Sequence, residues 1–275
     1  MKMDLVINLF EAFGTNEAER VQIIRAAGFD GFFPLWGGAS DVPSLVAEGR
    51  KIGLSCPSVH APFGHIRDVW GDDEAKAEAA VAEQIACLED CARAGVGLMV
   101  AHAFIGFKDH TPTEIGLDRF GRIVTAAEKL SVRIAFENTE GIEYLEAILG
   151  RFRDCPSVGF CWDSGHEMCY NHSRDLLALY GDRLLCTHLN DNLGIRDRGC
   201  EITWLDDLHL LPFDGIADWK YNRERLRKCG FAGPLTFELT TASKPGRHEN
   251  DLYAQMSPEV YLAECYKRAC RVAAL

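Results

Sequence analysis

Short apolar runs alternate along the chain with longer segments in which apolar residues recur at helical spacing. In the segment 73–94, for example, Val81, Ile85, Leu88 and Ala92 fall on one helical face. This alternation is typical of parallel strands joined by helices, and eight repeats of it predict an α/β fold closed into a (β/α)8 TIM barrel. The expected strands are 3–9, 31–35, 55–61, 97–101, 133–137, 160–163, 185–188 and 235–238.

Capping residues set the expected limits of the helices. Asn16 with Glu19 three positions later predicts the start of the first helix, and Gly28 its end. The other helices are expected over 41–51, 73–94, from about 113, 142–152, 175–180, 218–228 and 257–272. A polar, largely acidic stretch at about 190–217 predicts an extended loop after the seventh strand, within a single domain spanning 1–275.

Composition and cysteine usage fit a soluble globular protein of the cytoplasm. The 275 residues are 47% hydrophobic and 25% charged, near the typical length of one such barrel. The sequence contains no run of eighteen apolar residues, so no membrane-spanning helix is expected. The first ten residues include Asp4 and Asn8 and do not resemble a signal peptide. The eleven cysteines are scattered, mostly in apolar runs and without a CxxC pair, which favours reduced core thiols over disulfides or a thiolate zinc site.

The net charge of −12 disfavours nucleic acid as a partner, because non-specific binding to a polyanion requires a basic surface. A small-molecule substrate is expected instead.

Four of the predicted strands finish on a potential metal ligand: Glu137, Asp163, His188 and Glu238. A charge directly after a buried strand is costly unless it is paired or bound to a metal. In a (β/α)8 barrel the carboxyl ends of the strands form the active site, so three carboxylates would repel one another there without a cation. Carboxylate and imidazole ligands together predict a divalent ion: manganese, cobalt, magnesium or zinc. The alternative is four unrelated helix caps or salt bridges.

Other polar residues are expected at the same end of the barrel, each with more than one interpretation. His60 and His102 bind substrate, pack near the core with their polar atoms satisfied, or ligate an additional metal. His166 either contacts substrate or ligates a metal. Asp207 and His209 either ligate such a metal or anchor the long loop. Trp36 follows the second strand and either lines the pocket or packs in the core.

The motifs at these positions resemble the xylose-isomerase-like TIM-barrel superfamily, in order and over nearly the whole chain. They are Phe136-Glu137-Asn138-Thr139, Trp162-Asp163-Ser164-Gly165-His166, Thr187-His188-Leu189-Asn190-Asp191, Asp207-Leu208-His209 and Phe237-Glu238-Leu239. That grouping joins sugar phosphate isomerases and epimerases, ketose 3-epimerases and a metal-dependent apurinic-site endonuclease.

Resemblance to the ketose epimerases implies a metal-dependent isomerase or epimerase acting on a sugar or sugar phosphate. One metal would be held by Glu137, Asp163, His188 and Glu238, and the two glutamates would exchange protons with the substrate through an enediolate. Glu143 and His166 would touch the sugar, and Arg196 or Arg198 is the loose counterpart of a substrate-binding arginine. Related barrels often assemble as dimers or tetramers, so a homo-oligomer is expected.

Resemblance to the endonuclease implies a zinc-dependent phosphodiesterase with three ions, for which nine potential ligands are present. These are His60, His102, Glu137, Asp163, His166, His188, Asp207, His209 and Glu238. The acidic loop and net charge oppose a DNA-binding surface. A third interpretation is a non-catalytic barrel that binds a sugar or a partner protein, which would not require two opposed glutamates.

Overall fold

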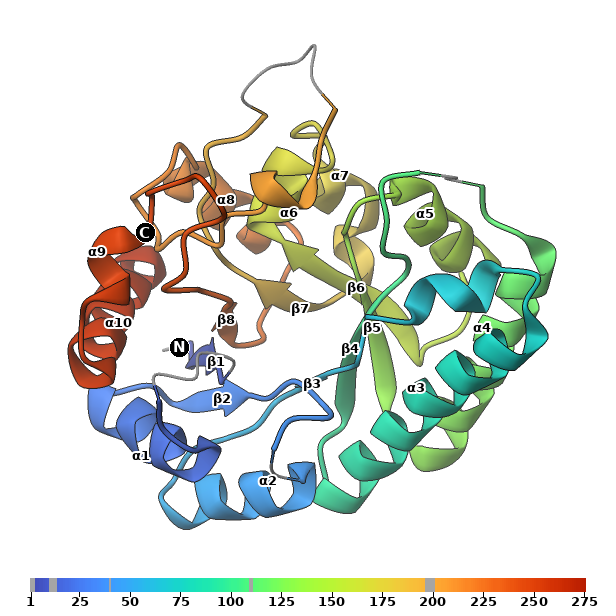
Figure 1. The fold of residues 1–275 in the computed structure, drawn as a ribbon, viewed down its shortest axis with the longest axis horizontal. Helices are drawn as coiled ribbons and strands as arrows, with labels where there is room; N and C mark the ends of the chain where they lie inside the picture. Colours follow the sequence, from blue (N-terminus) through green and yellow to red (C-terminus); the bar gives the residue numbers. More distant parts are fainter. Residues whose placement is uncertain (1–2, 10–13, 40, 109–110, 196–200) are drawn as a thin grey trace.

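The computed structural model describes residues 3–9, 14–39, 41–108, 111–195 and 201–275, and their eight strands form a ring (Figure 1). One parallel sheet has the order β2-β1-β8 and the other the order β3-β4-β5-β6-β7. The strands are β1 (Leu5–Asn8), β2 (Gly31–Phe33), β3 (Val59–His60), β4 (Leu98–His102), β5 (Arg133–Glu137), β6 (Val158–Asp163), β7 (Leu184–His188) and β8 (Leu235–Phe237).

Isolated parallel bridges join the two sheets. Gly31 with Ser55 and Leu35 with His60 connect the β2 side to the β3 side, while Leu189 with Phe237 connects β7 to β8. These links close the ring in chain order and confirm the predicted (β/α)8 barrel.

The helices surround the ring of strands (Figure 1). They are α1 (Glu17–Ala27), α2 (Val42–Lys51), α3 (Glu74–Ala94), α4 (Glu114–Leu130), α5 (Ile142–Arg151), α6 (Ser164–Cys169), α7 (Leu176–Tyr180), α8 (Trp219–Lys228), α9 (Asp251–Ala254) and α10 (Pro258–Ala274), with 3-10 turns η1 (Ile66–Trp70), η2 (Gly181–Arg183) and η3 (Trp204–Asp206). The capping box of Asn16 and Glu19 and the left-handed Gly28 at the end of α1 are confirmed. No helix in the described part of the chain is long and apolar enough to span a membrane.

Two local predictions are wrong. The third strand is shorter than 55–61, because Pro57 has no N–H to donate to a neighbouring strand. The short helix α6 was not expected; Asp163 caps it by accepting a hydrogen bond from the His166 backbone N–H at 2.7 Å.

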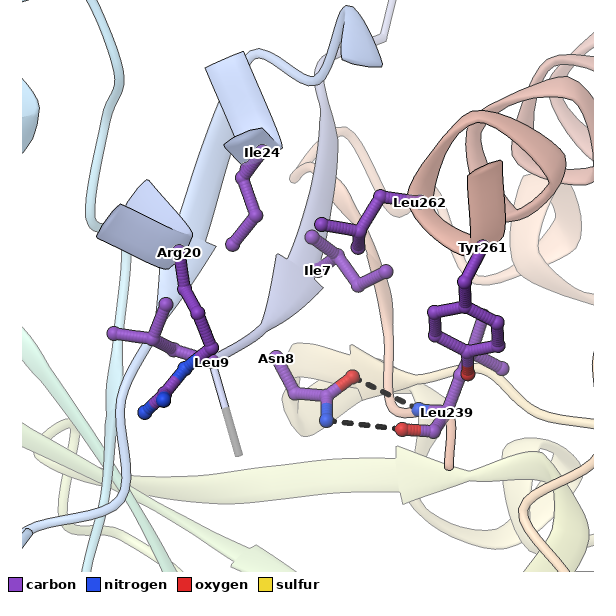
Figure 2. A pocket seen from close by; sticks show the side chains of 8 residues that line it. All are labelled: Ile7, Asn8, Leu9, Arg20, Ile24, Leu239, Tyr261 and Leu262. Atoms are coloured by element: carbon purple, nitrogen blue, oxygen red, sulfur yellow. Dashed lines mark hydrogen bonds between the residues drawn. The ribbon is translucent and has the colours of Figure 1, made fainter. Parts of the chain in front are cut away.

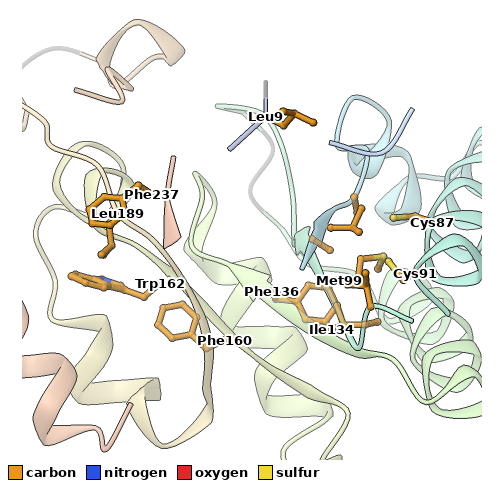
Figure 3. Packing of buried hydrophobic residues seen from close by; sticks show 14 of the residues in the cluster. Leu9, Cys87, Cys91, Met99, Ile134, Phe136, Phe160, Trp162, Leu189 and Phe237 are labelled. Atoms are coloured by element: carbon orange, nitrogen blue, oxygen red, sulfur yellow. The ribbon is translucent and has the colours of Figure 1, made fainter. Parts of the chain in front are cut away.

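Alternation along the strands decides which side chains enter the barrel. On β5, Ile134 and Phe136 pack in the large outer core with Phe160 and Trp162 of β6, as Figure 3 shows. Ala135 belongs to a second, inner cluster formed by Leu98, Val100, Ala135, Cys161 and Cys186. Because side chains alternate, each residue two positions beyond this inner layer also points inward, at the carboxyl end. For β4 to β7 these residues are His102, Glu137, Asp163 and His188.

A buried asparagine closes the seam between β1 and β8 (Figure 2). The Asn8 amide donates from Nδ2 to the Leu239 carbonyl at 3.0 Å, and Oδ1 accepts from the Leu239 N–H at 2.9 Å. The side chain therefore continues the backbone pairing beyond the last partners, Ile7 and Phe237.

Replacing Asn8 with alanine is expected to lower the free energy of unfolding by about 1–3 kcal/mol, because the backbone N–H and C=O of Leu239 lose their partners in the core. Urea unfolding measures the change. Asn16→Ala removes only a helix cap and is the control, with an expected cost of about 1 kcal/mol. A neutral Asn8→Ala would contradict this role.

The long loop between β7 and α8 is held by a single buried carboxylate, that of Asp191. Oδ1 accepts from the backbone N–H of Asn192 and Ala217, both at 2.9 Å. Oδ2 accepts from the Phe213 N–H at 2.8 Å and the Trp219 indole at 2.9 Å. Backbone N–H groups near both ends of the loop, those of Asn192 and Ala217, thus bind the same side chain, whose exposed fraction is 0%.

Candidate metal centre and cleft

Four side chains from consecutive strands converge at the carboxyl end of the barrel. Glu137, Asp163, His188 and Glu238 each place one potential ligand atom within 4.8 Å of those of the other three. Glu137, Asp163 and His188 have 0% exposure, whereas Glu238 is 9% exposed and reaches the cleft above. The structure thus brings together the four residues of the predicted metal site.

The potential ligand atoms of these side chains lie close to one another. His188 Nδ1 lies 2.8 Å from Glu238 Oε2 and 3.2 Å from Glu137 Oε2. Despite this proximity, both Glu137 oxygens, both His188 nitrogens and Glu238 Oε2 are buried without a hydrogen-bond partner among the described residues. Buried polar groups are normally satisfied, so this donor set fits a bound cation.

The charges of the three carboxyl groups also fit a bound cation. Burial opposes ionisation of Glu137, but the nearby imidazoles, that of His188 foremost, hold the pKa of its carboxyl well below the usual range. Burial likewise opposes ionisation of Glu238, yet His188 lowers its pKa to about 2. For Asp163 burial prevails and raises the pKa to about 6. Ionised carboxylates packed this closely need a compensating positive charge.

Two asparagines fix Asp163. The amide of Asn190 donates to Oδ2 of Asp163 at 2.8 Å, and the cap of α6 occupies Oδ1. Asn138 accepts from the Asp163 N–H at 2.8 Å and donates to its carbonyl at 2.9 Å. Such partners orient a ligand and hold its rotamer in place.

A second group of potential ligands adjoins the first. His166, Asp207 and His209 place ligand atoms within 4.8 Å of one another. The Asp207 carboxylate lies 3.4 Å from His166 Nε2 and 2.9 Å from His209 Nε2, and His166 Nδ1 lies 3.3 Å from Glu137 Oε1. His209 Nδ1 is also 3.1 Å from the Glu238 carbonyl, so this residue ties the long loop to β8. Both predicted roles, loop anchor and additional ligand, are compatible with this geometry.

His60 and His102 lie on the other side of Glu137. Their Nε2 atoms are 3.4 Å and 3.7 Å from Glu137 Oε2, respectively. His60 also forms a group of potential ligands with Glu137 and His188, and its Nδ1 is 2.7 Å from the Ala61 carbonyl. Burial lowers the pKa of His102 to about 3, so this imidazole is neutral.

A fourth group was not expected from the sequence. Cys161 and Cys186 are paired neighbours on β6 and β7, and their sulfurs lie within 4.8 Å of a His188 nitrogen and of each other. The spacing of the cysteines along the chain does not reveal this group of potential ligands, because adjacent strands bring the two thiols together.

A cleft of about 480 Å³ opens above these groups. Its apolar wall includes Phe63, Ile105, Phe107, Tyr170 and Trp204. Its polar lining comprises His60, His102, Glu140, His166, Asp207, His209, Glu238 and Lys244. A cleft of this size accommodates a small molecule.

The structure places two of the predicted substrate residues away from this lining. Trp36 packs against the core, and its indole donates to the Asp90 carboxylate on α3 at 2.8 Å. Glu143 is exposed in the first turn of α5. Arg196 and Arg198 lie outside the described residues.

Sequence reasoning missed two polar residues of the cleft, Glu140 and Lys244. Glu140 stands only three positions after Glu137, which was a usable signal. Lys244 lies in an irregular segment after β8, where no periodic pattern indicates direction.

Comparisons with known proteins agree with this architecture. Residues 21–260 match the family model described as xylose isomerase-like TIM barrel. A curated relative, the uncharacterized protein y4fM of Sinorhizobium fredii, is 36% identical over 114 residues, a match that spans 39% of this chain and 33% of that protein.

Two solved structures share the fold along their whole length. The IolI protein with a bound zinc atom superposes with a TM-score of 0.77 at 19% identity, covering 99% of this chain and 98% of that one. D-psicose 3-epimerase of Clostridium cellulolyticum H10, in complex with D-tagatose, superposes with a TM-score of 0.70 at 16% identity, covering 99% and 98%.

Proposed function

Because the chain belongs to the xylose isomerase-like TIM barrel family, we propose that it is a metal-dependent isomerase or epimerase of a sugar or sugar phosphate. The observation that carries this proposal is the pair of glutamates, Glu137 and Glu238, that approach the same nitrogen of His188 at the base of the cleft. The zinc of the IolI structure and the sugar bound to D-psicose 3-epimerase support it.

The residues present fit a divalent cation held by Glu137, Asp163, His188 and Glu238. Manganese, cobalt, magnesium or zinc would act there as a Lewis acid that polarises the substrate carbonyl and makes the neighbouring C–H more acidic.

The two glutamates then divide the proton transfer. One carboxylate removes the proton from carbon, giving an enediolate, and the other returns a proton. Return to the opposite face of the same carbon is epimerisation, and return to the neighbouring carbon is isomerisation. Asp163, fixed by Asn190 and the cap of α6, stays in place while Glu137 and Glu238 exchange protons.

The family resemblance also leaves a second candidate function, a zinc-dependent phosphodiesterase acting at apurinic sites. The group His166–Asp207–His209 favours it, because these side chains form an additional potential metal site beside Glu137. The net charge of −12 opposes it, since such an enzyme must bind a polyanion.

Metal analysis of protein purified without chelator or nickel resin tests the two candidates. We expect about one divalent ion per chain, because Glu137, Asp163, His188 and Glu238 form one site. Removing the ion with a chelator should abolish deuterium exchange from solvent into a substrate C–H, and adding it back should restore the exchange. About three zinc ions per chain, with cleavage of an abasic duplex, would instead establish the phosphodiesterase.

We also propose that residues 1–275 form one domain, and that the protein acts in the cytoplasm as a homo-oligomer. Light scattering of the metal-loaded protein measures the number of copies.

A further inference from the structure

One buried carboxylate of the cleft, that of Glu140, takes no part in the proposed proton transfer. Glu140 follows β5, is 8% exposed and lines the cleft together with His166 and Asp207. A carboxylate buried to this extent is costly unless hydrogen-bond donors satisfy it.

The turn into α5 directs Glu140 toward the cleft. Gly141 caps α5 in the left-handed region, with φ of 69° and ψ of 53°. A Cβ at this position would lie 2.8 Å from the Phe104 ring, so only glycine fits. After this turn the helix buries Tyr144 and Leu145 and leaves Glu143 exposed to solvent.

Glu140 is held in place with spare capacity to accept hydrogen bonds. The Gly106 N–H donates to its Oε1 at 2.7 Å. An ionised carboxylate offers about four acceptor sites, so this bond leaves most of them for donors in the cleft. Burial raises the pKa of Glu140, as expected for a carboxylate that still lacks donors.

The described lining of the cleft offers an anionic substrate no lysine or arginine that is not already beside a carboxylate. Glu140 and Asp207 line it in addition to the proposed metal ligand Glu238, and Lys244 is the only lysine or arginine of this described lining. Lys244 Nζ already lies 3.8 Å from Asp207 Oδ2 and 5.4 Å from the centre of the Trp204 ring. The imidazoles of His166 and His209 also face Asp207. A phosphate group would have to compete with Asp207 for these side chains, whereas sugar hydroxyls can donate to the carboxylates.

We infer that the cleft selects an unphosphorylated sugar, and that Glu140 is the specificity-determining residue that binds its hydroxyl groups. This inference rests on the proposed function and narrows its substrate class.

The first experiment compares Glu140→Gln with Glu114→Gln, which alters an exposed carboxylate in the first turn of α4, away from the described cleft lining. Deuterium exchange with a panel of ketoses and aldoses first identifies a sugar that the metal-loaded wild type accepts. Glu140→Gln should then raise KM for it about tenfold to a hundredfold with kcat nearly unchanged, and calorimetry should show the same loss of affinity. Glu114→Gln should leave both constants unchanged, and metal content should be equal in all three proteins.

A deoxysugar tests whether Glu140 binds one particular hydroxyl of the substrate. For the analogue that lacks the contacted hydroxyl, wild type and Glu140→Gln should bind equally, because the interaction is already absent. Equal KM values for the two proteins with every sugar tested would overturn the role of Glu140 and leave the proposed function intact.

The second experiment needs only wild-type protein, so it does not depend on the folding of a variant. Each accepted sugar is compared with its phosphate, and the unphosphorylated form should have a kcat/KM at least about tenfold higher. Preference for the phosphate would overturn the inference alone. No deuterium exchange with any sugar or sugar phosphate would overturn the proposed function, and the inference with it.

Discussion

Glu238→Gln in the metal-loaded protein is expected to lower turnover about a thousandfold or more, and Glu137→Gln equally. Glutamine keeps the shape of the side chain but cannot take up or return a proton, and losing a positioned acid or base costs about 10²–10⁴ in rate. Loss of either partner therefore stops a reaction that needs both. Solvent deuterium exchange and product formation measure the effect.

Metal content must be determined in the same samples, because both glutamates belong to the candidate metal site. A variant that has lost its ion reports on binding, whereas one that retains it reports on proton transfer. Glu114→Gln, which alters an exposed carboxylate in the first turn of α4, provides the matched control. Near-normal turnover by either metal-loaded variant would contradict the assignment.

Arg225→Met is expected to lower the free energy of unfolding by about 3–5 kcal/mol, because it leaves the buried Glu167 carboxylate without its cation. Arg225 Nη1 and Nη2 donate to Glu167 at 2.7 Å and 2.8 Å, and both side chains are 7% exposed. The guanidinium carbon also lies 5.0 Å from the centre of the Trp162 ring. Urea unfolding of metal-free protein measures the change.

An exposed ion pair of the same type supplies the control. Arg122 pairs with Glu78 across α4 and α3, with side-chain exposures of 52% and 43%. Arg122→Met should cost less than about 1 kcal/mol, because solvent screens exposed pairs. The double variant Glu167→Met/Arg225→Met should be more stable than Arg225→Met alone. Equal costs for the buried and exposed pairs would contradict this account.

The sequence predicted the barrel and its four convergent strand ends because both follow from alternation. A strand such as β5 that buries Ala135 inside must also direct Glu137 inside, and parallel strands gather their ends at one rim. The short helix α6 escaped prediction because it begins directly after the last residue of β6, Asp163, with no turn or loop residue between the two elements. Its signal was Asp163, whose side chain serves as the helix cap as well as a candidate ligand.

The substrate side of the cleft was less predictable. Resemblance pointed to Glu143, but one left-handed residue, Gly141, separates it from the carboxylate that lines the cleft, Glu140. Such a turn changes the direction of the backbone, but the amino-acid composition around it does not show that change. Likewise, the polar stretch after β7 indicated a loop, but only the structure reveals that Asp191 gathers its backbone.

Because Asp191 binds the backbone near both ends of the loop after β7, this loop forms a separate structural unit. Since one side chain secures both its entry at Asn192 and its exit at Ala217, the intervening length can change without altering the ring of strands. The loop contributes Trp204, which lines the cleft with 53% of its surface exposed. Exchanging it between related barrels offers a way to transplant substrate preference while the ligands at the strand ends keep their positions.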